Sequence, residues 1–591
     1  ISEGEEAQVY ALNILGNTDF DDKKLIGIME LGAQGIFGGR ENYSRQVLAG
    51  DLESLRSYYM DKGYINFQID STQVSLTPNK EDVYVTVNIT EGKVFTVRGV
   101  KLVGDLTLSN EVLKENIKIH KGDIFSRLRV ANTRKNISDR LAEQGYPFSN
   151  VNIVPDVDEN SQTVELSIAI DPGRRVYVRR VNIFGNQKTE DEVVRRELRQ
   201  FENDWLSTTS VARSKKRLDR TGFYKNVSIS TPPVPGTTDQ VDLNIKVDER
   251  STGNLSFGIG FSETQGALLN FAITQDNFMG GGKKVGIRID TSTATQQYSF
   301  SVTDPYFTDN GVSQSFSFLS RKLNAAKVNI ANYIVNTDSI RLGYGFPLSE
   351  NAFTRHSLAV EDTEMIAGTT TSAQTLQFIT DNNGGEPKYL LYKLNGSWNY
   401  DTRNRAIFAD NGFRTRASYE VALPNSELEF YKLRFSYLHY IELAEQYTFR
   451  YKLDLDYGAA YGDTTELPPF ARFYAGGSRS VRGYNGNTLG AKDSNGKPLG
   501  GDRRLITSLE MILPNPFAEQ SKDMRVTAFL DGGYVWAPGT NLDFGEMRYA
   551  AGAGIIWITP VGVMRFSLAN PLNDKPGDDT TSFQFTLGSD F

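Results

Sequence analysis

One pattern of apolar and polar positions occurs three times in this chain, and its copies align without a gap. They read EGEEAQVYALNILGN at 3–17, EGKVFTVRGVKLVGD at 91–105 and PGRRVYVRRVNIFGN at 172–186. Apolar residues alternate with polar ones and end at Gly-Asn or Gly-Asp, which predicts a strand that enters a turn with positive φ at the glycine. The N-terminal part of the chain is therefore a repeated domain.

Between the copies, the apolar residues change to a spacing of three and four, which is typical of helices. These stretches end at Gly63, Gly145 and Gly222, where a glycine suits a helix C-terminus. Each is followed by more alternation before the next copy of the pattern. We expect units of one strand, helices and two strands, about 70 to 90 residues long. They give three α+β domains, at 1–92, 93–173 and 174–250.

The first copy carries a further expectation. Its opening residues, Ile1-Ser2-Glu3-Gly4, match Ile89-Thr90-Glu91-Gly92, which finish the last strand of a domain. No basic and apolar segment of the signal-peptide type precedes them. We therefore expect a truncated, processed chain that starts at the tail of another domain.

Residues 251–591 alternate in period two, with no long helical pattern. In 449–457 the odd positions are apolar, while Arg450, Lys452, Asp454 and Asp456 occupy the even ones. The uncharged stretch 549–564 is too short to cross a bilayer as a helix and is interrupted by Pro560, so two strands fit better. Runs of about 9 to 12 residues with unequal loops favour a transmembrane antiparallel β-barrel of about 16 strands over a soluble β-fold.

Composition narrows the possible functions. The chain has 591 residues, a net charge of −8, three histidines and no cysteine. A negative net charge does not favour nucleic-acid binding. Without cysteine and with so few histidines, a nucleophile or metal constellation has almost no candidate residues. We expect neither an enzyme nor a bound metal or cofactor.

Several short motifs carry a resemblance. The three N-terminal units resemble POTRA domains, and Val481-Arg482-Gly483-Tyr484, within 458–502, resembles the VRG(F/Y) motif of the Omp85 superfamily. Further matches are Phe257-Gly258-Ile259-Gly260, Asp304-Pro305-Tyr306-Phe307 and the closing FQFTLG at 583–588. The resemblance covers the whole chain. It implies the central component of the machinery that folds and inserts β-barrel proteins into the outer membrane of a Gram-negative bacterium.

Other functions stay open. A TamA-like translocation and assembly factor natively has three POTRA domains, and a two-partner secretion transporter belongs to the same superfamily. The tail at residues 1–4 favours the assembly machinery, with these units as its third, fourth and fifth POTRA domains. A passive channel would need an open lumen, whereas the long 458–502 segment favours a plugged one.

The resemblance also implies an anchor for that long loop. In the superfamily the motif arginine pairs with acidic residues on late strands, which correspond to Glu510 and Asp531 here. Alternation agrees, because both acids lie opposite in parity to Leu509 and Leu530. Arg482 would join both carboxylates through charge-assisted hydrogen bonds. The alternative is that each is only a solvated charge of the lumen.

The first and last strands, at about 255–263 and 581–591, are expected to form a lateral gate. Gly258 and Gly260 weaken strand packing there, and a poorly bonded seam could open to receive an incoming strand. The terminal aromatic residues resemble the signal that client barrels carry, or they simply complete the lipid-facing stripe. The predicted gate residues are Phe257, Gly258, Ile259, Gly260, Phe583, Phe585, Leu587, Gly588 and Phe591.

The resemblance implies partners as well. Residues 195–202 resemble the segment that contacts the accessory lipoprotein BamD, with Arg199 and Glu202 as candidate contacts, although a charged helix face is commonly only solvated. The other implied partners are further accessory lipoproteins, unfolded outer-membrane clients, periplasmic chaperones and outer-membrane lipid, with no nucleic acid. The POTRA domains would lie in the periplasm and receive nascent chains along their strand edges.

Overall fold

The structure is a computed structural model. It describes residues 7–32, 42–262, 264–349, 351–405, 408–444, 446–515, 523–559 and 562–588. The chain divides into two compact units, one of residues 1–187 with 191–250 and the other of residues 188–190 with 251–591. The expected tail at residues 1–4 lies outside the described residues.

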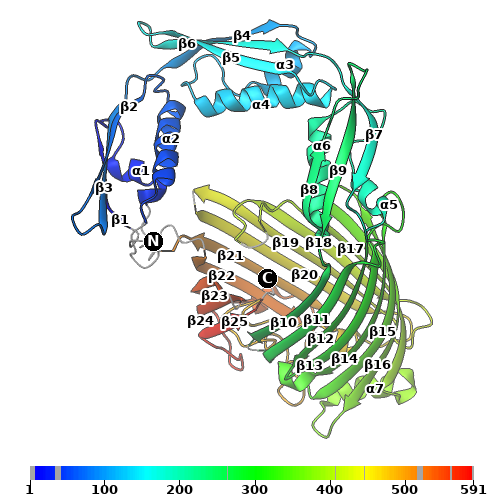
Figure 1. The fold of residues 1–591 in the computed structure, drawn as a ribbon. Helices are drawn as coiled ribbons and strands as arrows, with labels where there is room; N and C mark the ends of the chain where they lie inside the picture. Colours follow the sequence, from blue (N-terminus) through cyan, green and yellow to red (C-terminus); the bar gives the residue numbers. More distant parts are fainter. Residues whose placement is uncertain are drawn as a thin grey trace. The chain divides into compact units, whose positions relative to one another are not determined.

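The first unit contains three domains of the predicted order (Figure 1). In each sheet the first strand pairs in parallel with the third, which also pairs with the second in antiparallel orientation. The first domain comprises β1 (Gln8–Leu15), α1 (Asp22–Ile26), η1 (Glu30–Gly32), α2 (Arg45–Asp61), β2 (Gln68–Leu76) and β3 (Asp82–Thr90). The second comprises β4 (Thr96–Gly104), α3 (Asn110–Asn116), α4 (Arg127–Glu143), β5 (Asn150–Asp158) and β6 (Thr163–Asp171). The third comprises β7 (Tyr177–Phe184), α5 (Asp191–Arg195), α6 (Thr208–Thr221), β8 (Tyr224–Ser230) and β9 (Gln240–Glu249).

The repeated glycine of the sequence pattern has a backbone reason. Gly16, Gly104 and Gly185 have φ of 99°, 105° and 90°, a region that side chains disfavour. A Cβ at any of them would also collide with a carbonyl oxygen of the central strand of its sheet. The pattern therefore marks the point where the first strand leaves the sheet.

The second unit is a closed barrel in which neighbouring strands pair in antiparallel orientation (Figure 1). Sixteen strands are found among its described residues, as the alternation predicts. The first eight are β10 (Gly253–Ser262), β11 (Gly266–Phe278), β12 (Lys283–Ser292), β13 (Thr295–Asp304), β14 (Ser313–Asn324), β15 (Tyr333–Pro347), β16 (Ala352–Ala367) and β17 (Lys388–Asp401). The others are β18 (Gly412–Ala422), β19 (Phe430–Ala444), β20 (Tyr447–Ala460), β21 (Arg503–Leu513), β22 (Met524–Trp536), β23 (Arg548–Thr559), β24 (Gly562–Pro571) and β25 (Phe583–Leu587).

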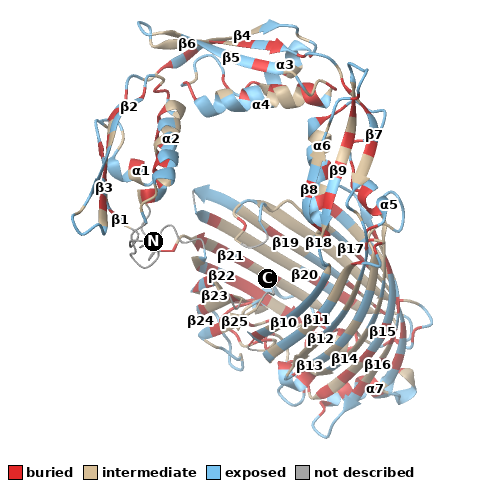
Figure 2. Ribbon diagram, in the orientation of Figure 1, coloured by how far each residue is buried: buried red, intermediate tan, exposed pale blue. Residues whose placement is uncertain are grey.

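The two faces of the wall follow the predicted parity. Leu433 and Leu455 are more than 40% exposed on the outer face, where lipid would cover them, while Asp456 of the opposite parity is buried. Exposed and less exposed stretches are both present along the barrel strands (Figure 2). The uncharged stretch 549–564 forms parts of β23 and β24, as predicted. Across the described residues, every helix is too short or too polar to span a bilayer.

The barrel has a near end, where β10 begins, and a far end, where β20 leads into the long loop 461–502. At the far end this loop packs with α7 (Ala373–Asp381) and with the ends of β15 and β17 in one apolar cluster. Leu467, Phe473 and Phe378 are almost fully buried in it. The loop then folds back into the barrel, where it reaches β21 and β22.

Candidate functional site

The Arg482 anchor, formed by Arg482, Glu510 and Asp531, lies inside the barrel. The Arg482 guanidinium donates from Nε to Asp531 Oδ2 (2.6 Å), from Nη2 to Asp531 Oδ1 (2.8 Å) and from Nη1 to Glu510 Oε1 (2.7 Å). All three side chains are at most 3% exposed. The structure thus brings together the three residues that the sequence placed there, in a bidentate geometry that only arginine provides.

Three neighbours complete this arrangement. The Arg482 guanidinium stacks on the Phe529 ring, 3.3 Å from its centroid, and Ser508 Oγ donates to Asp531 Oδ1 (2.7 Å). The second oxygen of Glu510 accepts from Arg450 Nη1 (2.6 Å). Phe529 and Arg450 are not among the anchor residues predicted from the sequence. Their inward parity on β22 and β20 was the available signal, although parity does not say which inward residues meet.

The rest of the motif is packed against the wall. Val481 and Tyr484 are fully buried, in a small apolar cluster with Ile506, Val535 and Ala550. Gly483 has a φ of 90°, and a Cβ there would lie 3.1 Å from that of Ala550. The motif therefore requires glycine at position 483 for both conformational and steric reasons.

Beyond the motif, the loop pairs with the segment that leads into the last strand. Thr581 N donates to Gly483 O (3.0 Å), and Asn485 N donates to Asp579 O (2.8 Å), which form a short antiparallel bridge. The buried Gln584 of β25 donates from Nε2 to Tyr484 O (3.0 Å). The anchored loop is thus hydrogen-bonded directly to β25 and its lead-in; we refer to this contact as the loop latch.

The seam between β10 and β25 is described only in part, because residues 263 and 589–591 lie outside the described residues. Among the described residues these strands share one registered pair, Phe261 with Leu587. Every other neighbouring pair of the barrel shares between five and fifteen. In the same register Phe257 and Ile259 of β10 would face positions 591 and 589, which lie outside the described residues.

The predicted gate residues divide by parity. Phe257, Ile259, Phe583 and Phe261 face outward and are 40–67% exposed. Phe261 also stacks across the seam on Phe585, at 6.1 Å between centroids. Gly260 lets the backbone of β25 come close to β10, because a Cβ at this position would lie 3.0 Å from Leu587 O. Gly588 has a φ of 139°. At Gly258 a Cβ would meet the Asn270 side chain. Phe591 is not among the described residues.

The candidate lipoprotein contacts Arg199 and Glu202 follow helix α5, which ends at Arg195. They lie in a turn, so the alternative of a solvated helix face does not apply to them, and the predicted contact itself stays a prediction. The segment leaves the helix because the buried Gln200 accepts from Ser207 N (2.8 Å) and donates to Trp205 O (3.0 Å). Arg199 and Glu202 are both exposed, although Glu202 also accepts a hydrogen bond from Val181 N (2.8 Å).

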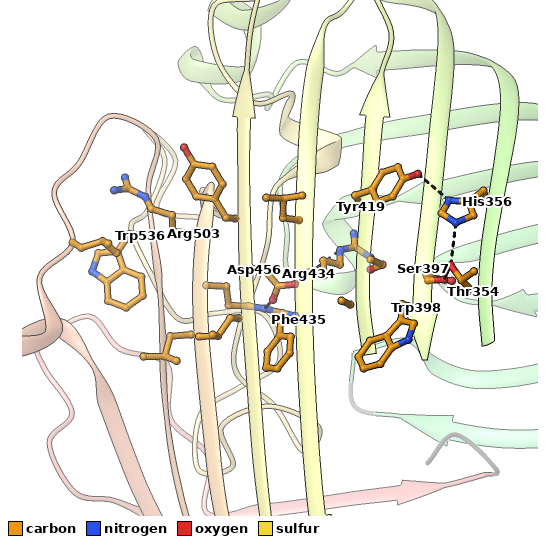
Figure 3. A pocket seen from close by; sticks show the side chains of 18 of the residues that line it. Thr354, His356, Ser397, Trp398, Tyr419, Arg434, Phe435, Asp456, Arg503 and Trp536 are labelled. Carbon is orange, nitrogen blue, oxygen red and sulfur yellow. Dashed lines mark hydrogen bonds and ion pairs between the residues drawn. The ribbon is translucent and has the colours of Figure 1, made fainter. Parts of the chain in front are cut away.

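A groove of about 770 Å³ lies on the outer wall of the barrel. Its floor includes the outward residues Leu433 and Leu455. At one side His356 hydrogen-bonds both Thr354 Oγ1 and Tyr419 Oη, each at 3.0 Å (Figure 3). No cluster of side chains able to hold a metal ion is found among the described residues. The groove is an apolar surface that faces the membrane.

Comparisons with known proteins agree with this architecture. Residues 277–591 match the Omp85 superfamily domain, and 8–92, 95–173 and 176–250 match the POTRA family, described as surface antigen variable number repeat. The outer membrane protein assembly factor BamA of Neisseria meningitidis serogroup B is 32% identical, over 100% of this chain and 79% of its own length. That of Nitratidesulfovibrio vulgaris is 23% identical, over 100% and 74%.

A solved structure is also similar. The crystal structure of BamA from Haemophilus ducreyi lacking POTRA domains 1–3 superposes with a TM-score of 0.68 at 30% identity, covering 84% of this chain and 100% of that one. Its similarity extends through most of the chain, as do the matches in sequence. The chain therefore belongs to the Omp85 superfamily, in its BamA family of outer-membrane protein assembly factors of Gram-negative bacteria.

Proposed function

We propose that the β10–β25 seam is the lateral gate through which this assembly factor inserts client strands. The single observation that carries the proposal is the one registered pair across the seam, against five or more at every other junction among the described residues. Unpaired backbone groups at a strand edge can template an incoming strand. A client strand would add to β10 or β25 and leave sideways into lipid.

The loop latch supports a role for the anchor in this gate. Arg482 holds the loop to β21 and β22, and the next three residues hold the lead-in to β25. The last strand is therefore fixed from inside the barrel more firmly than from its neighbour β10. In the proposed mechanism, the latch keeps β25 in place while β10 separates from it.

The three POTRA domains are proposed to lie in the periplasm and to guide clients toward the barrel. Each sheet leaves its first and second strands as edges, on which an extended chain can add. The exposed turn with Arg199 and Glu202 is the proposed contact for BamD, and further lipoproteins and periplasmic chaperones are the other proposed partners. The chain shows no nucleotide-binding motif, so burial of client side chains in lipid would supply the driving force.

A disulfide across the seam tests the gate. Because the chain has no cysteine, Phe261→Cys with Leu587→Cys gives one defined pair, at the spacing of directly opposite residues in a sheet. Assembly of an unfolded porin is measured in proteoliposomes that contain the full chain with its accessory lipoproteins. We expect the oxidised variant to be inactive and a reductant to restore activity.

The matched control is Ile555→Cys with Phe566→Cys, which joins the outward, directly opposed positions of β23 and β24. This lock should leave assembly unchanged with or without reductant. Full activity of the oxidised seam variant would disprove the lateral gate. Conductance in planar bilayers, measured on the same samples, distinguishes an assembly factor from a passive channel.

A further inference from the structure

The two joints between neighbouring POTRA domains repeat one backbone contact. At the first joint Phe95 N donates to Gly63 O (2.9 Å), and at the second Val176 N donates to Gly145 O (3.0 Å). Each glycine lies two residues after the last residue of a long helix, α2 in the first domain and α4 in the second. Helix α2 contacts α4, and α4 contacts α6. The two joints can therefore be compared residue by residue.

At the first joint, a carboxylate of one domain caps the helix of the next. Asp61, the last residue of α2, accepts from Leu128 N (2.7 Å) and from Ser126 Oγ (3.1 Å) at the start of α4. Ser126 is also the N-cap residue of α4, because it accepts from Arg129 N (3.2 Å). The first N–H groups of a helix have no partner within it and carry partial positive charge, so a carboxylate suits them.

The second joint has the same helix start without the carboxylate. Ser207 caps α6 by accepting from Ser210 N (3.2 Å). Thr209, two residues after this cap, has no acceptor for its N–H among the described residues. The last residue of α4 is Glu143, whose carboxylate pairs with Arg140 of the same helix (2.7 Å). The donors that a carboxylate binds at the first joint are therefore available at the second.

A cavity of about 480 Å³ lies at these donors. Glu143 of the second domain lines it, together with Ser207, Thr209 and Arg213 of the third. Arg213 is exposed, and across the described ranges its side chain takes part in no hydrogen bond or ion pair. The cavity thus places a guanidinium beside a helix N-terminus, and this combination attracts anions.

The charges around the cavity agree with an anionic ligand. Its lining contains two acids, of which Glu143 already pairs with Arg140 and Asp204 is exposed. Helix α6 continues from the cavity with exposed basic residues at a spacing of three and four, which places them on one face. They are Arg213, Lys216 and Arg220. An acidic segment that enters the cavity would therefore meet a basic helix face beside it.

We propose that this cavity binds a carboxylate of a partner protein, in the place that Asp61 takes at the first joint. An acidic side chain there would accept from Thr209 N and Ser207 Oγ, and its neighbours would lie along the basic face of α6. Arg199, which the proposed lipoprotein contact uses, also lines the cavity but is not needed for the site. The site is independent of the lateral gate and of that contact.

Binding of an acidic peptide to the detergent-solubilised full chain tests the site. The probe is a heptapeptide with blocked ends that has three aspartates among glycines and serines and carries a neutral fluorophore. Its counterpart has asparagines in place of the aspartates. At about 0.15 M salt we expect a saturable rise in fluorescence anisotropy for the acidic peptide and none for the counterpart. Equal binding of the two peptides, or no binding of either, would overturn the site.

Two variants locate the binding. Glu143→Asp gives this position the side chain of Asp61, so it should cap α6 from within the chain and weaken peptide binding by about tenfold. Arg213→Gln removes a charge-assisted hydrogen bond and should also weaken binding by about tenfold. The control Arg134→Gln removes the same charge from an exposed position of α4 outside the cavity and should bind as the wild type does. Wild-type affinity in Glu143→Asp or in Arg213→Gln would overturn the proposal.

Competition identifies the partner that supplies the carboxylate. The accessory lipoproteins and an unfolded porin are added separately to the chain with the labelled peptide bound. Displacement by one of them assigns the carboxylate to that protein, and displacement by neither would overturn the assignment to a partner. The three substituted positions are exposed, so each variant should fold. Because the assay needs no assembly activity, its failure would leave the proposed gate and lipoprotein contact untouched.

Discussion

Two parts of one barrel wall are held in contrasting ways. Around β20 to β22, neighbouring strands share ten or eleven registered pairs, and a guanidinium joins carboxylates of two strands inside the lumen. At the seam, β10 and β25 share one such pair among the described residues, with an outward contact between Phe261 and Phe585. The first part relies on backbone ladders and buried charge, the second on exposed apolar side chains.

Under the proposed gate, this difference would let one part of the barrel stay rigid while another opens. Buried charges are costly to separate from their partners, so the anchored wall keeps a single arrangement. Exposed apolar contacts across a seam exchange readily for lipid contacts, so little free energy is lost when they part. The loop latch connects the two, because it links the anchor to the lead-in of β25; among the described residues no such backbone hydrogen bond joins the loop to β10.

Removal of the anchor should have the largest effect. Arg482→Ala leaves Glu510 and Asp531 buried without their guanidinium, and breaking a buried pair in this way costs about 3–5 kcal/mol. We expect a lower Tm of the barrel and loss of porin assembly in proteoliposomes. Arg288→Ala, which removes an exposed lumen arginine of β12, is the control. A wild-type Tm for Arg482→Ala would show that the anchor does not hold the wall.

The next effect concerns the glycine of the motif. Gly483→Ala places a side chain at a φ of 90°, which costs roughly 1–2 kcal/mol for a non-glycine residue, and presses its Cβ against Ala550. Spin labels at Leu255→Cys and Leu568→Cys report the width of the seam by pulsed EPR. We expect a broader distance distribution across the seam. Labels at Ile287→Cys and Ile340→Cys, on well-paired strands, should show no change.

The sequence predicts the barrel, and it names the three anchor residues that the structure brings together. Alternation in period two fixes which residues face inward, but only through the resemblance of the 481–484 motif to the superfamily could Glu510 and Asp531 be named. The loop latch could not, because main-chain hydrogen bonds between 483–485 and 579–581 leave no side-chain pattern. The turn that contains Arg199 and Glu202 could not be foreseen either. It depends on the side chain of Gln200, which accepts a hydrogen bond from the backbone of Ser207.

A smaller effect is expected from the side-chain part of the latch. Gln584→Leu removes the hydrogen bond to Tyr484 O, which contributes about 1 kcal/mol. Part of this is offset, because the buried Gln584 Oε1 has no hydrogen-bond partner among the described residues. The same seam labels should report a small broadening, less than that of Gly483→Ala. An effect as large as that of Arg482→Ala would mean that the latch, and not the anchor, fixes β25.

The smallest effect on the barrel is expected from Glu91→Gln. This substitution replaces a buried carboxylate that backbone and hydroxyl groups bind. Glu91, in the first POTRA domain, accepts hydrogen bonds from Thr18 N (2.9 Å) and from Tyr59 Oη (2.8 Å). Burial alone raises the pKa of Glu91, but the hydrogen bonds from Thr18 and Tyr59 outweigh it and hold the pKa below its ordinary value of 4.5.

A lowered pKa in the folded state gives stability that is present above pH 4.5 and is lost as the pH falls through the lower folded value. Hydrogen exchange of the full chain, measured between pH 6 and pH 3 with correction for intrinsic rates, should therefore show β1 and β3 losing protection in acid. Glu91→Gln should remove most of this pH dependence. Protection of β21 and β22 should be the same in both proteins, since the carboxylate lies in the other unit. Equal loss of protection in the wild type and in Glu91→Gln would assign the acid sensitivity of this domain to other groups.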